Sequence, residues 1–117
     1  MTLKRRKREK MGVRVEQTVR SSSHMQWVRG HECAIAGKHE CSGGIEAHHT
    51  RLGTPAAMSQ RRGDDQTVPL CSAAHAELHA RGEATFHVTY GVDLLALAAE
   101  LWAKSPHRIK YESRERT

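Results

Sequence analysis

Hydrophobic and polar positions change over short distances along this chain, which predicts a domain built from short elements. Residues 45–48 and 67–70 are each predicted to form a short strand. Pro69 suits an edge strand or a strand end, because proline cannot donate to a central ladder. Residues 86–90 are rich in aromatic and β-branched side chains, so we expect them to be extended.

Two stretches have the composition and spacing of helices. Residues 72–81 are rich in alanine, with Ser72 as a candidate N-cap and Gly82 placed to end the helix. Asp93 is expected to cap a last helix that runs to about Lys104, in which leucines recur at helical spacing. Short strands followed by helices predict a small α+β domain.

The remaining segments lack hydrophobic periodicity. Residues 1–23 are predicted to be a disordered basic arm and 109–117 a polar tail, which leaves a single domain at 24–108. Within that domain, residues 31–44 contain two cysteines and three glycines and are expected to form a turn-rich knuckle. Residues 50–66 are polar and are expected to form a long loop.

The charge of the chain is concentrated at one end. The net charge is +6, and residues 1–20 hold eight Lys or Arg against two Glu, so the rest of the chain is balanced. Such an arm binds polyanions through counterion release, without reading sequence, and DNA is the expected partner. A merely solubilising tail is the alternative. A polybasic membrane anchor is less favoured, because the arm lacks an apolar face.

Composition adds two constraints. With 38% hydrophobic residues and a single Phe, the core is thin, and thin small domains often need a metal ion to hold them together. Three cysteines are an odd number, and no apolar run approaches the ~20 residues that span a bilayer. No apolar segment of the kind found in secretory signals follows the basic start. We therefore expect a cytoplasmic protein with reduced or metal-bound thiols and no membrane partner.

Two groups of histidines carry the candidate chemistry. His75 and His79 are four residues apart on a predicted helix, so they share one face and suit a single metal ion. Glu77, between them, should face away from that ion. His48 and His49 are adjacent on a predicted strand, so their side chains diverge and only one can join the same metal. The other imidazole is left free to take a proton from water beside a hydrolytic metal.

The order of these motifs resembles the HNH (ββα-metal) endonuclease family. The resemblance runs from Trp27 to Gly82, about half of the chain. Within the family, the sequence is similar to the phage and prophage branch that includes the RecA-dependent recombination-enhancement nuclease. It rests on one ordered set of motifs: Cys33, Cys41, Ile45-Glu46-Ala47-His48-His49, Gly63-Asp64-Asp65, Val68-Pro69-Leu70-Cys71, His75 and His79.

The resemblance implies a ββα-metal nuclease domain with a zinc-knuckle-like N-terminal loop and a C-terminal helix. It implies that His49 is the general base and that one divalent ion, Mg, Mn or Zn, is bound by three ligands: His48, His75 and His79. The middle residue of the motif, usually Asn, falls at Gln66, and Asp64 or Asp65 is the alternative. The products would carry 5′-phosphate and 3′-hydroxyl ends.

The cysteines suggest a second, structural site. HNH domains often hold zinc with two Cys-x2-Cys pairs, and here Ala36 and Ala74 stand where the second members would be. Zinc in structural sites is usually four-coordinate. The expected ligands are the three cysteines and one histidine: Cys33, Cys41, Cys71 and either His39 or His31. Three buried free thiols are the alternative.

These observations favour a metal-dependent DNA endonuclease. Two other functions remain open at this point: a non-catalytic zinc-bearing module that binds nucleic acid, and a recombination accessory factor that acts with a recombinase filament. The second rests on the family resemblance alone.

Overall fold

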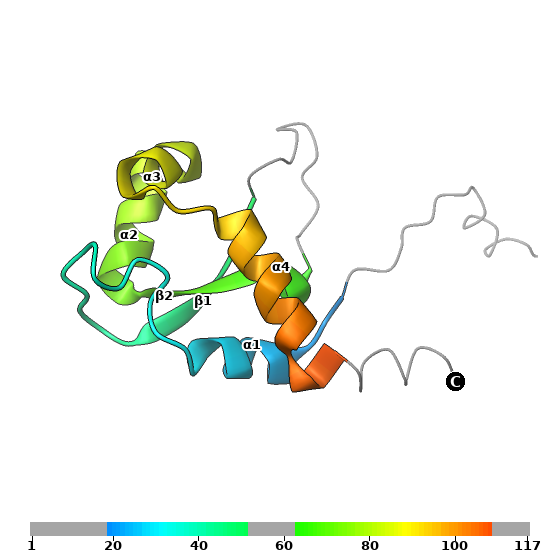
Figure 1. Cartoon of the computed structure of the whole chain (residues 1–117). Helices are drawn as coiled ribbons and strands as arrows, with labels where there is room; N and C mark the ends of the chain where they lie inside the picture. The colour runs from blue at the N-terminus through cyan, green and yellow to red at the C-terminus, as the bar shows by residue number, and fades with distance from the viewer. Residues whose placement is uncertain (1–18, 52–62, 109–117) are drawn as a thin grey trace, which may run out of the picture.

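A two-stranded antiparallel sheet runs across the middle of the molecule in the computed structural model, which describes residues 19–51 and 63–108 (Figure 1). The described residues form a small, compact α+β unit. Its elements follow in the order α1 (Ser22–Arg29), β1 (Ile45–His49), η2 (Asp64–Gln66), β2 (Thr67–Cys71), α2 (Ser72–Arg81), α3 (Glu83–Tyr90) and α4 (Leu94–Lys104). Both predicted strands are confirmed, each one residue longer than expected.

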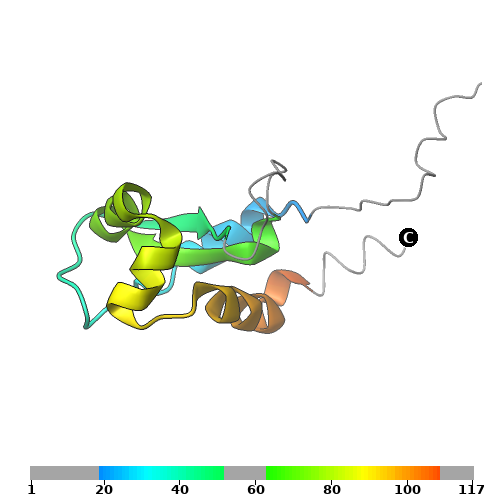
Figure 2. The same ribbon diagram turned by 90° about the horizontal axis from the view of Figure 1, so that it is seen from above.

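The sheet is covered by helices. β1 pairs with β2 in a register that sets Ile45 opposite Cys71 and His49 opposite Thr67. Every residue of β2 is buried, because α1 and α4 both pack against this strand. Figures 1 and 2 show α2 and α3 together at one end of the sheet, while the last turn of α4 approaches α1 at the other.

α2 follows β2 without a connecting loop, over the residues predicted. The predicted cap is wrong by one position: Cys71 is the N-cap, and its Sγ accepts a hydrogen bond from the N–H of Ala74 at 3.3 Å. Ser72 lies one residue inside the helix, where its hydroxyl donates to Glu46 at 2.8 Å. Gly82 ends the helix as expected, with a φ of 95° that favours glycine.

The prediction of an extended segment at residues 86–90 is wrong, because these residues belong to α3. Phe86 is completely buried, and the ring of Tyr90 packs on it one turn later, with 5.0 Å between centroids. Val88 is 84% exposed. In a strand all three side chains would share one face, so the helix is the conformation that buries Phe86 and leaves Val88 in solvent. Tertiary packing here overrides the strand preference of the side chains.

α1 and α4 close the other end of the fold. α1 begins at Ser22, inside the predicted arm, and its N-cap Ser21 accepts from the N–H of His24 at 3.1 Å. His24 is buried, and its Nδ1 lies 2.8 Å from the hydroxyl of Ser105, just beyond α4. α4 has the predicted cap, since Asp93 accepts from the N–H of Ala96. The rest of the predicted arm, residues 1–18, and the predicted tail, 109–117, lie outside the described residues.

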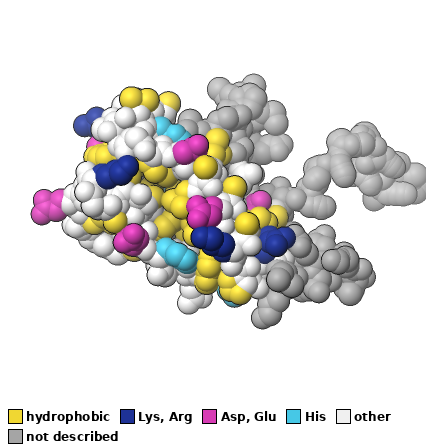
Figure 3. All heavy atoms as spheres, viewed as in Figure 1, with side chains coloured by type: hydrophobic (Ala, Val, Ile, Leu, Met, Phe, Trp, Pro, Cys, Tyr) yellow, Lys and Arg dark blue, Asp and Glu magenta, His cyan; other side chains and the backbone are white. Residues whose placement is uncertain are grey.

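The core lies between β2 and the helices and is formed by ten buried side chains: Cys33, Ile35, Val68, Leu70, Cys71, Ala74, Leu78, Phe86, Leu94 and Ala98. On the face drawn in Figure 3, acidic and basic side chains are interspersed around hydrophobic ones. Within the described part of the chain, no helix combines the length and apolarity needed to cross a bilayer.

Candidate functional site

Three imidazoles from two elements converge beside the sheet. His48 comes from β1, and His75 and His79 lie one turn apart on α2. Nδ1 of His48 is 3.2 Å from Nε2 of His75, which in turn is 3.1 Å from Nε2 of His79. The ligand atoms of all three lie within 4.8 Å of one another, near enough to bind one metal ion.

Their spacing can be compared with that of real metal sites. With metal–nitrogen distances of 2.0–2.1 Å, two ligand nitrogens are about 3.3 Å apart around a tetrahedral ion. For an octahedral ion with the same bond length, the separation is about 2.9 Å. The two short nitrogen–nitrogen distances, 3.1 and 3.2 Å, lie between these values. These two separations are therefore compatible with ligation of one ion.

Two carboxylates lie behind the rings. Oε1 of Glu46 is 2.6 Å from Nδ1 of His75, and Oε1 of Glu83 is 3.4 Å from Nε2 of His48. A carboxylate beside a ring nitrogen favours a proton on that nitrogen, which leaves the opposite nitrogen with its lone pair. The lone pairs of His48 and His75 thus face each other, an arrangement that a cation between them would stabilise.

The electrostatics of the site agree with this assignment. Burial opposes ionisation of Glu83, but hydrogen bonds from His48, Thr50 and the backbone of Arg51 lower its pKa to about 2. A hydrogen bond from His75, with one from Ser72, lowers the pKa of Glu46. Both carboxylates are therefore ionised near neutral pH. Burial lowers the pKa of His79, as do the neighbouring rings of His75 and His48, which favours the neutral imidazole that metals bind.

His49 points away from this cluster, as expected for adjacent residues on a strand. Its Nε2 lies 2.9 Å from Oδ1 of Asp64, a residue with only 4% of its surface exposed. Asp64 is held in place by the N–H of Ser21, which donates to Oδ2 at 2.7 Å. An N–H of His49 directed at this carboxylate leaves Nδ1 of the ring with its lone pair, as a general base requires.

A shallow pocket joins the two groups of histidines. Its lining includes both residues of the His48-His49 pair and a cation, Arg51, which follows β1. The lining residues are Ala47, His48, His49, Arg51, His75 and His79. The candidate metal ligands and the candidate base therefore share one solvent-accessible surface.

Gln66, predicted at the middle position of the motif, contacts the end of β1 through its backbone. Its carbonyl accepts from the N–H of Thr50 at 3.0 Å, which ties the end of β1 to η2. Its buried Oε1 has no hydrogen-bond partner among the described residues. The side chain beside His49 is instead that of Asp64, one of the two alternatives considered from the sequence.

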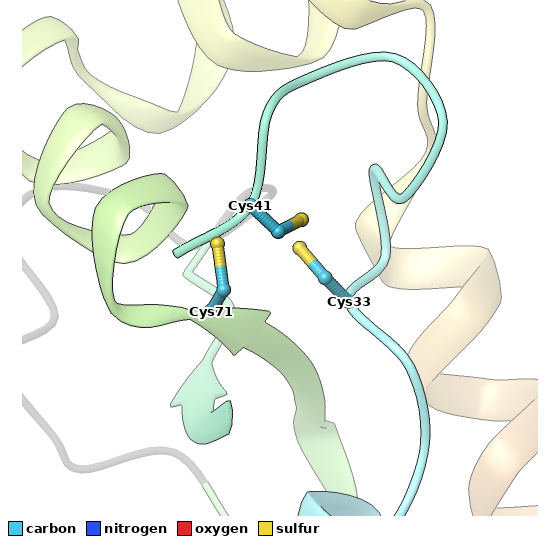
Figure 4. A group of neighbouring side chains, drawn as sticks. All are labelled: Cys33, Cys41 and Cys71. Carbon is cyan, nitrogen blue, oxygen red and sulfur yellow. The ribbon is translucent and has the colours of Figure 1, made fainter. Parts of the chain in front are cut away.

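The three cysteines also converge, as Figure 4 shows. Their Sγ atoms lie within 4.8 Å of one another, near enough to bind a metal ion. Desolvation of its sulfur and hydrogen bonds with Cys71 and Cys33 raise the pKa of Cys41 to about 12. Burial opposes ionisation of Cys71, but the backbone N–H groups of Ala74 and Ser42 lower its pKa. Among the three thiols, the backbone N–H groups therefore favour ionisation of Cys71.

A glycine allows the loop with Cys41 to approach α2. Gly43 has a φ of 84°, and a Cβ at this position would lie 2.5 Å from Cβ of Ser72. Two backbone hydrogen bonds hold the loop against α2. The N–H of Ser72 donates to the carbonyl of Gly44 at 2.9 Å, and the N–H of Ala73 donates to the carbonyl of Ser42 at 3.2 Å. A side chain here would therefore move Cys41 away from Cys71.

The structure places both candidates for the fourth thiol-site ligand elsewhere. Nε2 of His39 lies 3.4 Å from Glu77, which also accepts a hydrogen bond from Tyr90, so Glu77 faces away from the histidine cluster as predicted. Nδ1 of His31 lies 2.9 Å from the carbonyl of Trp27. Among the described residues, the group of neighbouring metal-ligating side chains around Cys41 contains cysteines only.

Comparison with known families adds one finding. Residues 10–105 match the model of a family described as "Protein of unknown function (DUF968)". The chain belongs to this family. The match to the DUF968 family spans both groups of candidate ligands and the His49–Asp64 pair. No curated protein and no solved structure matches the chain significantly. The function of this DUF968 domain must therefore be argued from its own geometry.

Proposed function

We propose that this chain is a metal-dependent endonuclease of the HNH type, which hydrolyses phosphodiester bonds in DNA. One observation carries the proposal. Three imidazoles, those of His48, His75 and His79, converge in a pocket that also contains a fourth, His49, paired with a buried carboxylate. The order of β1, η2, β2 and α2 around them supports the sequence resemblance to the family.

Each residue then has a separate role. His48, His75 and His79 hold the divalent ion, which when bound supplies Lewis-acid stabilisation of charge on a phosphate. Nδ1 of His49 takes the proton from the attacking water, because its Nε2–H is directed at Asp64. The carboxylate of Asp64 fixes this tautomer and stabilises the imidazolium that forms. Imidazole ligands suit zinc well, and manganese or magnesium is the alternative ion for turnover.

DNA is proposed as the substrate because of the charge distribution. The basic residues of positions 1–20 would neutralise DNA phosphates without selecting a sequence. Arg51, at the rim of the pocket, is suited to contact a phosphate near the scissile one.

The direct test is cleavage of plasmid DNA by the purified chain with zinc, manganese or magnesium, compared with the same protein in EDTA. His49→Ala should lower the rate about 10²–10⁴-fold, the usual contribution of a general base. His107→Ala serves as the control, since this histidine lies just after α4 and does not line the pocket. If His49→Ala cuts as fast as the parent, the assignment of the base is wrong.

We further propose that the cysteine cluster is a zinc knuckle that stabilises the fold. The support is the convergence of three sulfurs from three separate positions in the sequence. The intact protein should bind two metal ions. Cys33→Ser should remove one and lower the thermal stability, because the binding energy of a structural zinc is folding energy. His75→Ala should remove the other with little effect on stability.

The cysteine cluster is also the observation that favours a second candidate function, a non-catalytic module that binds nucleic acid. Binding of DNA with zinc at the thiols, and no cleavage with any of the three metals, would support that alternative. A recombination accessory role is tested in the same assay by adding a recombinase filament with ATP to an otherwise inactive mixture. Cutting that appears only then would identify the filament as a required partner.

A further inference from the structure

Glu83 connects the start of α3 to the end of β1. Only 10% of its side chain is exposed, and it follows Gly82 as the first residue of the helix. One oxygen accepts a hydrogen bond from the hydroxyl of Thr50, and the other accepts from the N–H of Arg51 at 3.0 Å. That second oxygen also lies 3.4 Å from Nε2 of His48.

We propose that Glu83 is a positioning residue for the metal centre, which selects the tautomer of His48 and holds its ring toward His75 and His79. The role rests on the metal site in the proposed function, but it does not depend on nuclease activity. Glu83 touches a ligand rather than the ion or the substrate, so its contribution is to metal affinity.

The tautomer argument follows from the two sides of the His48 ring. A proton on Nε2 is stabilised by the carboxylate of Glu83, and Nδ1 then presents its lone pair to Nε2 of His75, 3.2 Å away. Without Glu83, the proton can move to Nδ1 and be donated to His75 as an internal hydrogen bond. That bond would close the cluster on itself, and a metal ion would have to break it before binding.

The same carboxylate also fixes the backbone that carries the ring. Thr50 and Arg51 immediately follow β1, so their hydrogen bonds to Glu83 anchor the strand end at two points. Since Glu83 itself belongs to α3, it ties this helix to the metal centre. A carboxylate that orients a metal-binding histidine in this way typically changes metal affinity by one to two orders of magnitude.

Glu46 holds His75 in the equivalent way, but from a more exposed position. Its side chain is 48% exposed, against 10% for Glu83. Solvent competes with the exposed contact, so the loss of Glu46 should weaken metal binding less than the loss of Glu83. This order of effects is part of the proposal.

The test is a zinc titration of the full chain, in which binding is monitored through the ring ¹⁵N resonances of His48 and His75. These signals report on this site separately from the thiols, and in metal-free protein they also report which nitrogen of His48 carries the proton. Glu83→Ala should weaken zinc binding at the histidines about ten- to hundredfold and shift His48 toward the Nδ1–H form, because nothing then accepts from Nε2. Glu83→Gln should have a smaller effect, because its amide oxygen can still accept from Arg51 and His48 while the hydroxyl of Thr50 accepts from the NH2 group. Glu46→Ala should weaken zinc binding less than Glu83→Ala.

Glu77→Gln is the matched control, because Glu77 lies on α2 between the two helical histidines but accepts from Tyr90 on the other side. Its zinc affinity should equal that of the parent. If Glu83→Ala does not fold, Glu83→Leu decides instead, since leucine fills a similar volume and has no acceptor. Unchanged zinc affinity and an unchanged His48 tautomer in the variant without an acceptor would overturn the role of Glu83. A parent in which zinc leaves His48 and His75 unshifted would instead refute the metal centre itself.

Discussion

Asp64→Asn is the substitution that most directly tests the pairing of His49 with a buried carboxylate. Both neighbours of Asp64 are donors: the N–H of Ser21, 2.7 Å from Oδ2, and Nε2 of His49, 2.9 Å from Oδ1. An asparagine presents one oxygen and one NH2 group, so one of the two donors must face the NH2. A backbone N–H cannot change its role, whereas an imidazole can change its tautomer.

The expected result is therefore a switch at His49. Its Nε2 would accept from the new amide, its proton would move to Nδ1, and the ring would lose the lone pair that takes the proton from water. The cleavage rate should fall about 10²–10³-fold, within the usual contribution of a general base, which corresponds to about 2.7–4 kcal/mol of activation free energy. Stability should change by about 1 kcal/mol or less, because both hydrogen bonds to residue 64 are kept. The ion pair with Arg20, at 4.0 Å and with Arg20 41% exposed, contributes little.

The assay is single-turnover cleavage of plasmid DNA at saturating metal, with zinc affinity and urea unfolding measured on the same samples. Glu100→Gln is the matched control, because it also removes one carboxylate charge but lies in an exposed ion pair with Lys104 on α4. An Asp64→Asn protein that cleaves within threefold of the parent would refute the tautomer argument. A slower protein that has also lost metal would refute the separation between the base and the metal ligands.

Three further predictions concern stability and binding. Phe86→Ala should lower the free energy of unfolding by about 3–5 kcal/mol in urea, because Phe86 is fully buried, whereas Val88→Ala, at an 84% exposed position, should change it by less than about 0.5 kcal/mol. An equal loss in both variants would contradict the packing of α3. Burial, with a smaller contribution from His107, lowers the pKa of His24 from 6.5 to about 4. The unfolded chain therefore binds the extra proton first, so stability should fall by up to about 3 kcal/mol as the pH drops from 6.5 to 4, and His24→Gln should flatten that slope in unfolding curves. Removing residues 1–18 should weaken DNA binding and reduce the slope of log affinity against log salt, while the metal content stays the same; an unchanged slope would show that these residues do not contact phosphates.

The elements that sequence reasoning predicted are those with local signals. β2 has a short apolar run, and in β1 the apolar Ile45 and Ala47 alternate with polar residues. α2 and α4 combine good helix formers with a stop or a cap, at Gly82 and Asp93. α3 was mispredicted because its side chains prefer strands, and the burial of Phe86 that decides the matter depends on residues far away in sequence. α1 is not predicted from the sequence, because its position also depends on distant contacts. The N–H of Ser21, a residue assigned to the disordered arm, donates to Asp64, 43 residues later.

The residues of the candidate site also differ in whether they have a local signal. The candidate metal-ligand histidines of α2 can be predicted from their spacing, since one helical turn separates His75 from His79. Their carboxylate partners come from contacts between distant residues: Glu46 is 29 residues from His75, and Glu83 is 35 from His48. A signal for Glu46 existed, because alternate residues of a strand share a face and Glu46 is two before His48. For Glu83, the sequence around Gly82 contains no such signal.

The direct junction between β2 and α2 constrains how this domain can vary. Cys71 ends the strand and caps the helix, and His75 follows one turn later, so one uninterrupted piece of backbone carries one candidate thiol ligand and two candidate imidazole ligands. Inserting a single residue between Cys71 and His75 would rotate both helical histidines by about 100° around the helix axis, away from His48. Relatives that keep both groups of ligands should therefore tolerate no change of length from Cys71 to His79. Length variation among such relatives should then fall outside this junction.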